Sequence, residues 1–137
     1  MVSTAFDLTN TFIHLGRKAV ATELPDFSWR TDYLADYLRR FAEDGLDARL
    51  VGVVHIAQTW SHWECHTGGD EVVVQLSGRS DVIQEIDGQH HTITLTPGLG
   101  VINRRGVWHT SDVHEPGESL FIVGGRRTIY RPRGPAA

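Results

Sequence analysis

The spacing of apolar residues changes once along the chain, from a helical pattern to a strand pattern. Between residues 31 and 43, apolar side chains recur every three or four positions, which places them on one face of a helix. They are Tyr33, Leu34, Tyr37, Leu38 and Phe41. Gly45 follows, and glycine readily takes the backbone conformation that ends a helix. The pattern predicts an amphipathic helix over 31–43, preceded by a segment, 12–29, that only weakly indicates extended chain.

From residue 49 onward the pattern is that of short strands separated by turn residues. The predicted strands are 49–56, 59–66, 71–76, 80–86, 91–95, 100–103, 107–112 and 120–124. Asp87-Gly88 predicts a tight hairpin turn, because glycine supplies the positive φ that such a turn needs. About eight short strands behind one helix predict an all-β sandwich or barrel, since an open sheet of that size would leave exposed edges.

Composition narrows the function classes. A chain of 137 residues fits one domain. With 13 basic and 17 acidic residues it lacks the basic surface that nucleic acid requires. No apolar run approaches the roughly 20 residues of a membrane helix, and the start of the sequence lacks signal-peptide features, so a cytoplasmic protein with no membrane partner is expected. Cys65, the single cysteine, excludes an intrachain disulfide and is expected to be a small buried residue.

Residues 63–78, WECHTGGDEVVVQLSG, concentrate the candidate chemistry. Alternation along a strand places Glu64 and His66 on one face and Cys65 on the other. After a turn, Glu71 begins a strand whose face it shares with Gln75. If this strand returns antiparallel beside its predecessor, Glu71 lies next to His66. The stretch is open to three interpretations: a metal site, a pair of carboxylates for proton transfer, or a polar strand end.

A second cluster lies about 30 residues further on, in PGLGVINRRGVWHTSD at residues 97–112. Pro97-Gly98 and Arg105-Gly106 are turn signals, which places His109 a few residues into a strand. One imidazole there could complete a site with the first cluster. His62 shares the face of His66 but lies about 13 Å away along an extended strand, so it is expected at the rim.

The two clusters resemble the two motifs of the cupin superfamily. The first motif of that family runs Gly, five residues, His-x-His, three or four residues, Glu, six residues, Gly, and this chain has Glu64-x-His66, four residues, Glu71, six residues, Gly78. The second runs Gly, five residues, Pro-x-Gly, two residues, His, three residues, Asn. The corresponding positions here are Gly98, Arg104-x-Gly106 and His109. Three positions depart from the family: Glu64 replaces the first histidine, Arg104 the proline and Val113 the asparagine.

The resemblance implies a small jelly-roll barrel over residues 49–127, after an N-terminal extension (1–48) that carries the helix and before a C-terminal tail (128–137). It also implies a divalent metal, held in the family by three histidines and one glutamate. Carried over by position, the ligands are Glu64, His66, Glu71 and His109. Two carboxylates and two imidazoles favour Mn, Fe, Zn or Ni over Cu, and they cancel the charge of the ion.

The leading expectation is a metal-dependent enzyme that acts on a small carbonyl, enol or carboxylate substrate. Glu64 and Glu71 are the candidate catalytic residues, since without metal one of two neighbouring carboxylates can hold a proton to neutral pH. Gln75 and Arg104 are the candidate substrate-binding residues, Arg104 because a guanidinium can clamp a carboxylate. The alternative is a non-catalytic module with a metal-free polar pocket that binds a sugar or another small molecule. A homodimer is expected by resemblance.

Overall fold

The computed structural model describes residues 2–124 and 127–134. Within them the chain forms two antiparallel sheets and one α-helix, α1 (Thr31–Arg40), with short 3₁₀ segments η1 (Arg17–Ala19) and η2 (Ala42–Asp47). The strands are β1 (Phe12–Leu15), β2 (Ala21–Leu24), β3 (Arg49–Ile56), β4 (His62–His66), β5 (Glu71–Gln75), β6 (Arg79–Ile86), β7 (Gln89–Leu95), β8 (Gly100–Asn103), β9 (Trp108–Glu115), β10 (Gly117–Val123) and β11 (Thr128–Pro132). No helix in these ranges is long and apolar enough to cross a membrane.

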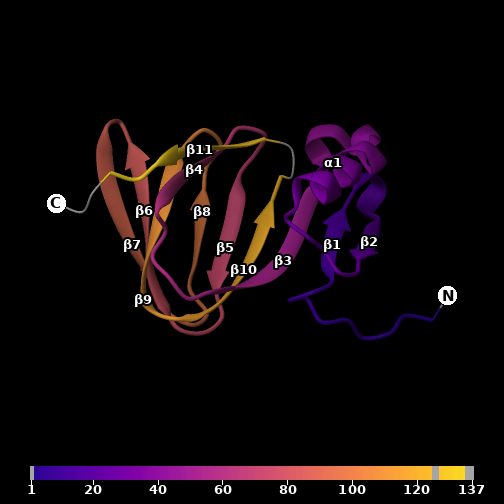
Figure 1. Ribbon diagram of the computed structural model, residues 1–137, viewed down its shortest axis with the longest axis horizontal. Coiled ribbons are helices and arrows are strands. Elements are labelled where there is room, and N and C mark those ends of the chain that lie inside the picture. Colours follow the sequence, from indigo (N-terminus) through magenta and orange to yellow (C-terminus); the bar gives the residue numbers. More distant parts are fainter. Residues whose placement is uncertain (1, 125–126, 135–137) are drawn as a thin grey trace.

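The two sheets face one another and enclose an interior (Figure 1). Among the described residues, the first sheet has the strand order β2-β1-β3-β10-β5-β8 and the second the order β11-β4-β9-β6-β7. Consecutive strands often belong to opposite sheets, so the chain crosses repeatedly between them. This architecture confirms the predicted all-β jelly-roll barrel with a helix-containing N-terminal extension.

The expected antiparallel pairing of the strands on either side of residues 67–70 is wrong. β4 pairs with β9 and β11, whereas β5 pairs with β10 and β8. The turn therefore carries the chain from one sheet to the other, and Glu71 faces His66 across the interior rather than along a ladder. Alternation determines which face a side chain occupies but leaves the partner strand open.

The clearest sequence signals reappear in the structure. The predicted strands 49–56 and 100–103 coincide with β3 and β8. Asp87 and Gly88 have φ of 52° and 75° and close the two-residue hairpin between β6 and β7. The strand predicted from residue 59 begins only at His62, and the helix ends at Arg40 instead of residue 43.

Part of the predicted C-terminal tail is a strand. β11 pairs with β4 along the edge of the second sheet, and Arg131 lies over the ring of Trp63, with 5.1 Å from its guanidinium carbon to the ring centroid. The Arg131 guanidinium also binds Glu85. Residues 125–126 of the predicted barrel and 135–137 of the predicted tail lie outside the described residues.

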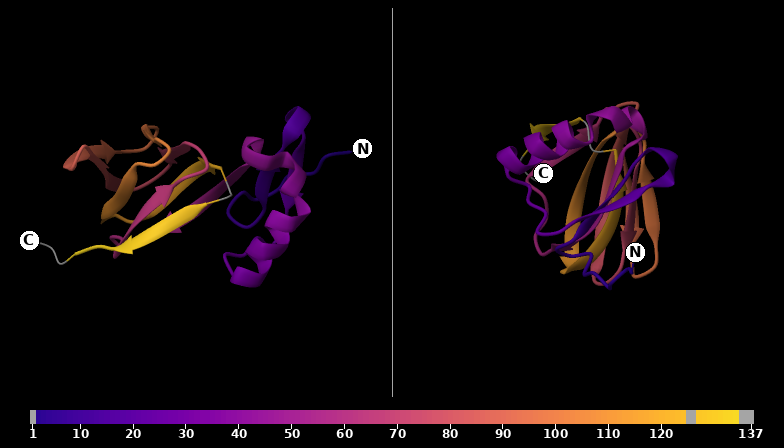
Figure 2. Two further views of the ribbon diagram at one scale, coloured as in Figure 1. Left: turned by 90° about the horizontal axis from the view of Figure 1, so that it is seen from above. Right: turned by 90° about the vertical axis from the view of Figure 1, so that its right-hand side faces the viewer.

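The N-terminal extension continues the first sheet, because β1 pairs with β3 on one side and β2 on the other. Helix α1 packs against this part of the sheet, beside the barrel (Figure 2). The buried residues at this contact form one apolar cluster with residues of β3 and β10: Phe12, Leu24, Tyr37, Leu50, Phe121 and Val123. Since Phe121 and Val123 also line the barrel interior, the extension forms one end of that interior.

Candidate functional site

Three cross-strand pairs bring the polar side chains of the interior together. Glu64 of β4 lies opposite His109 of β9, and His66 of β4 opposite Thr128 of β11. In the facing sheet, Glu71 of β5 lies opposite Asn103 of β8. Directly opposed residues of an antiparallel pair project from the same face, and here that face is the interior. The site therefore consists of one short row of side chains from each sheet.

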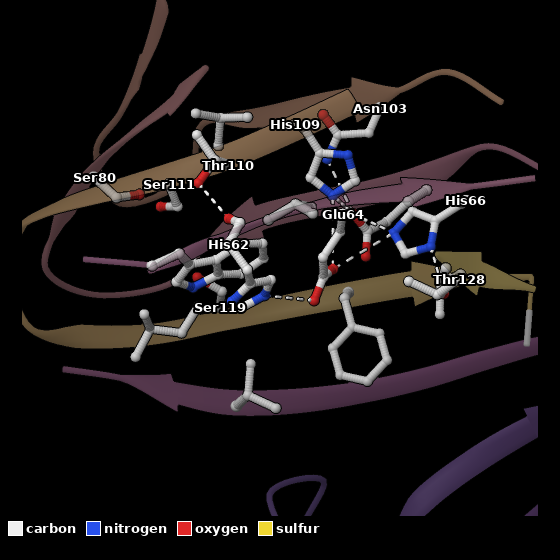
Figure 3. A pocket seen from close by; sticks show the side chains of 18 of the residues that line it. His62, Glu64, His66, Ser80, Asn103, His109, Thr110, Ser111, Ser119 and Thr128 are labelled. Carbon is white, nitrogen blue, oxygen red and sulfur yellow. Dashed lines mark hydrogen bonds and ion pairs between the residues drawn. The ribbon is translucent and has the colours of Figure 1, made fainter. Parts of the chain in front are cut away.

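Three of the four residues expected as ligands, Glu64, His66 and His109, converge at one point (Figure 3). Glu64, His66 and His109 each offer a ligand atom within 4.8 Å of the other two. Glu71 approaches from the opposite sheet, with its Oε1 at 3.3 Å from His66 Nε2 and 3.4 Å from His109 Nε2. The geometry therefore unites residues that are up to 45 positions apart in the sequence.

Both histidines turn an unpaired nitrogen toward this point. Within residues 2–124 and 127–134, His66 Nε2 and His109 Nε2 are the buried side-chain atoms that lack a hydrogen-bond partner. His109 Nδ1 donates to the carbonyl of Val107 at 3.4 Å, so a neutral ring keeps its lone pair on Nε2. His66 Nδ1 is hydrogen-bonded to Thr128 Oγ1 at 2.8 Å. Leaving two buried nitrogens unpaired is costly, and a divalent cation would use both lone pairs, so the donor set fits such an ion.

Glu71 is held in its ionised form. Burial by itself raises the pKa of this carboxyl, but the His66 imidazole 3.3 Å away, the charge of His109 and a hydrogen bond from Asn103 outweigh it, and the pKa is lowered. Asn103 Nδ2 donates to Glu71 Oε1 at 3.0 Å, while Gln84 Nε2 donates to Asn103 Oδ1 at 2.8 Å. A chain of neutral amides thus orients the buried carboxylate.

The pKa of Glu64 is shifted in the opposite direction, upward. Burial raises its pKa and the charge of Glu71 adds to the effect, against a hydrogen bond from His62. His62 Nε2 lies 3.1 Å from Glu64 Oε1, and the His62 side chain, 37% exposed, sits at the rim as predicted. The two carboxylates therefore differ in proton affinity, which is the usual basis for dividing acid–base roles between two such groups.

The pKa values of the two imidazoles, His66 and His109, are also shifted in opposite directions. Burial lowers the pKa of His109, and the charge of His66 lowers it further. For His66, burial acts in the same direction, but the carboxylates of Glu71 and Glu64 outweigh it and raise the pKa. His66 therefore holds a proton to higher pH than His109 when no ion is bound.

These residues lie within a pocket of about 470 Å³, a size typical of small-molecule sites. Both sheets line it, and the N-terminal extension contributes Trp29 and Leu34. Trp60 stacks on His62 with ring centroids 5.0 Å apart. The pocket combines a polar end that carries the carboxylates and imidazoles with apolar walls that include Val54, Ile56 and Phe121.

Of the two residues predicted to bind substrate, Gln75 lies in the pocket and Arg104 does not. Gln75 lines the pocket, but its Oε1 accepts hydrogen bonds from Ser80 and Ser119 and its Nε2 donates to the carbonyl of Ser77. Arg104 does not line the pocket: its side chain is 67% exposed and donates to Asp70 at 3.1 Å. The substrate role expected for Arg104 is therefore corrected, because its position before the Gly106 turn directs it to the surface. Cys65 is buried, as predicted, and burial raises the pKa of its thiol.

Sequence reasoning missed the residues that support the ligands. Asn103, Gln84 and Thr128 had no predicted role. The hydrogen bonds to Glu71 and His66 join residues 32 and 62 positions apart. Only the ladder pairings of β5 with β8 and of β4 with β11 create these contacts, and no local pattern specifies them.

Solved structures provide the comparison for this architecture, since no family model and no curated protein matches the sequence. Oxalate decarboxylase from Bacillus subtilis, studied for its Mn(II) centres, superposes with a TM-score of 0.52 at 15% identity, over 69% of this chain and 26% of that one. Oxalate oxidase in complex with glycolate gives a TM-score of 0.51 at 12% identity, over 59% of this chain and 45% of that one. This chain thus spans less than half of either enzyme.

A cupin-2 domain protein from Shewanella frigidimarina aligns at 21% identity with a TM-score of 0.45, over 62% of this chain and 71% of that one. At such identities the likeness concerns the fold alone. The likeness to the two oxalate enzymes, taken with the two facing antiparallel sheets, shows that this chain has the jelly-roll fold expected from its sequence.

Proposed function

We propose that the protein binds one divalent metal ion through His66, His109, Glu71 and Glu64 and acts on a small organic molecule in the pocket. One observation carries the proposal: two buried imidazole nitrogens without hydrogen-bond partners face two carboxylates that would neutralise a divalent charge. When bound, the ion would supply Lewis acidity toward a carbonyl or enol oxygen. Mn, Fe, Zn and Ni all suit this ligand set.

The protein groups divide the remaining tasks. Glu71 is ionised and oriented by Asn103, which suits a permanent ligand. Glu64 has a raised pKa and lies nearer the pocket mouth, where its side chain is 19% exposed. We assign Glu64, whose side chain is 19% exposed against 11% for Glu71, the transfer of a proton to or from the substrate when it is not coordinated to the ion. Thr128 orients the His66 ring through Nδ1.

Metal analysis tests the proposal directly. Protein purified without chelators is expected to contain close to one Mn, Fe, Zn or Ni per chain, or to bind one on reconstitution. His66→Ala and His109→Ala should each remove most of the binding, whereas His55→Ala, on the outer face of β3, should not. A metal content well below one per chain, with no gain on reconstitution, would overturn it in favour of a metal-free binding pocket.

A further inference from the structure

The charges around the pocket constrain what it can bind. Among the described residues that line it there is no lysine or arginine, while Glu64 and Glu71 both face the interior. Arg104 and Arg131, which lie in the neighbouring segments, are bonded to Asp70 and Glu85 instead. An anionic ligand would thus lose its hydration without gaining a lysine or arginine as partner. Even with a divalent ion present, the two carboxylates have already balanced its charge.

The apolar walls supply attraction for an uncharged body. Val54, Ile56 and Phe121 line the interior. At the mouth, Trp29 from the extension and Tyr130 from β11 remain 56% and 64% exposed. Large aromatic side chains exposed at the rim of a cavity gain free energy when a ligand covers them.

Two serine hydroxyl groups of the interior, those of Ser80 and Ser119, have already used their protons. Gln75 Nε2 donates to the Ser77 carbonyl at 2.6 Å, which fixes the amide so that its Oε1 faces the serines. Ser80 donates to that Oε1 at 2.9 Å and Ser119 at 3.3 Å. What these two hydroxyls still offer is lone pairs, so they accept hydrogen bonds from a ligand that carries a donor.

We infer that the pocket selects an uncharged molecule with an apolar ring and a hydroxyl donor, of the phenol or alcohol class, and that Trp29 and Leu34 of the extension determine its fit. The inference deepens the proposed function and rests on it for the reaction, although binding by itself does not require the metal. The apolar ring lies between the aromatic rim and the Phe121 wall. The hydroxyl groups of the ligand reach the acceptor oxygens of Ser80 and Ser119.

A matched pair of probes tests the inference. 2-(4-Hydroxyphenyl)ethanol and 4-hydroxyphenylacetate have the same ring and similar length, but only the second carries a carboxylate. The neutral probe is expected to bind at least about ten-fold more tightly, measured by calorimetry and by quenching of tryptophan fluorescence. The measurement is made on metal-loaded and on chelator-treated protein, with the metal content of each sample determined.

Substitutions of Trp29 and Leu34 test whether the extension contributes to ligand binding. Trp29→Ala and Leu34→Ala should each weaken binding of the neutral probe, by about ten-fold for the tryptophan, while Leu46→Ala, exposed in η2, leaves it unchanged. Trp29→Arg should shift the preference toward the carboxylate, because it places a guanidinium at the rim. Trp29 is more than half exposed but its ring contacts Phe27 and Phe121, so circular dichroism of each variant is compared with that of the wild type.

The outcomes separate the two proposals. Failure to bind metal, with the neutral preference intact, overturns the proposed function and leaves the ligand class standing. Equal or tighter binding of the carboxylate, in either metal state, overturns the ligand class whatever the metal content. Wild-type affinity for the neutral probe in both Trp29→Ala and Leu34→Ala overturns the role of the extension.

Discussion

Asn103→Ala isolates the residue that orients the buried carboxylate. Asn103 is 1% exposed and links Gln84 to Glu71. The substitution removes a hydrogen bond to a charged acceptor, worth about 1.5–3 kcal/mol, and leaves a small cavity. Gln84 keeps its second hydrogen bond, to the carbonyl of Ile102 at 3.0 Å. We therefore expect the free energy of unfolding of the metal-free protein to fall by about 2–4 kcal/mol at pH 7.

The pH dependence of this loss has a definite sign. The folded-state pKa of Glu71 lies below its unfolded value of 4.5, so its stabilisation is complete above 4.5 and is lost as the pH falls through the folded-state pKa. The difference between wild type and Asn103→Ala should accordingly narrow below pH 4.5. In the same variant, metal affinity should fall by about 10- to 100-fold, as when other residues that support ligands are removed.

Urea denaturation followed by tryptophan fluorescence measures the loss, and calorimetric titration measures the affinity. Asn10→Ala, at an exposed position, is the matched control and should change neither quantity. A loss below about 0.5 kcal/mol at pH 7, which is the size of an ordinary surface substitution, would refute the role of Asn103. So would a loss that stays constant as Glu71 becomes protonated.

Three further predictions concern the ligands and the core. Metal affinity should rise with pH through the raised pKa of His66, by about ten-fold per pH unit for each proton displaced, in calorimetric titrations across a pH series. Leu24→Ala should lower the free energy of unfolding by about 2–5 kcal/mol, and exposed Leu46→Ala by much less, in urea melts. Gly117→Ala should destabilise by about 1–3 kcal/mol in the same assay, because its Cβ would lie 2.1 Å from a backbone oxygen, whereas Gly69→Ala meets no such neighbour.

The sequence specified the faces of strands better than their partners. Alternation correctly predicted that Glu64, His66 and Glu71 face the interior. The spacing of the second motif correctly placed His109 with them. The prediction that β4 pairs with β5 was wrong. The alternation of polar and apolar residues is the same whether two strands pair or face each other across an interior.

Strands β1 and β2 lie in the segment 12–29, which only weakly indicated extended chain, and β11 lies in the predicted tail. β1 and β2 have four residues each and are joined through Lys18 and Ala19, both at positive φ, which no residue type there signals. β11 ends in Pro132 and is held by an edge pairing with β4, to which its own composition contributes little. The predicted homodimer stays a prediction.

The pairing of β1 with β3 has a practical consequence for any attempt to prepare the barrel by itself. Removing residues 1–48 would convert β3 into a free edge, with the backbone groups that now bind β1 open to other chains. It would also expose Leu50 and Phe121 to solvent; they are 2% and 7% exposed in the intact chain. An unprotected edge beside bare apolar side chains is a template for intermolecular strand addition, so the truncated barrel is expected to aggregate during expression.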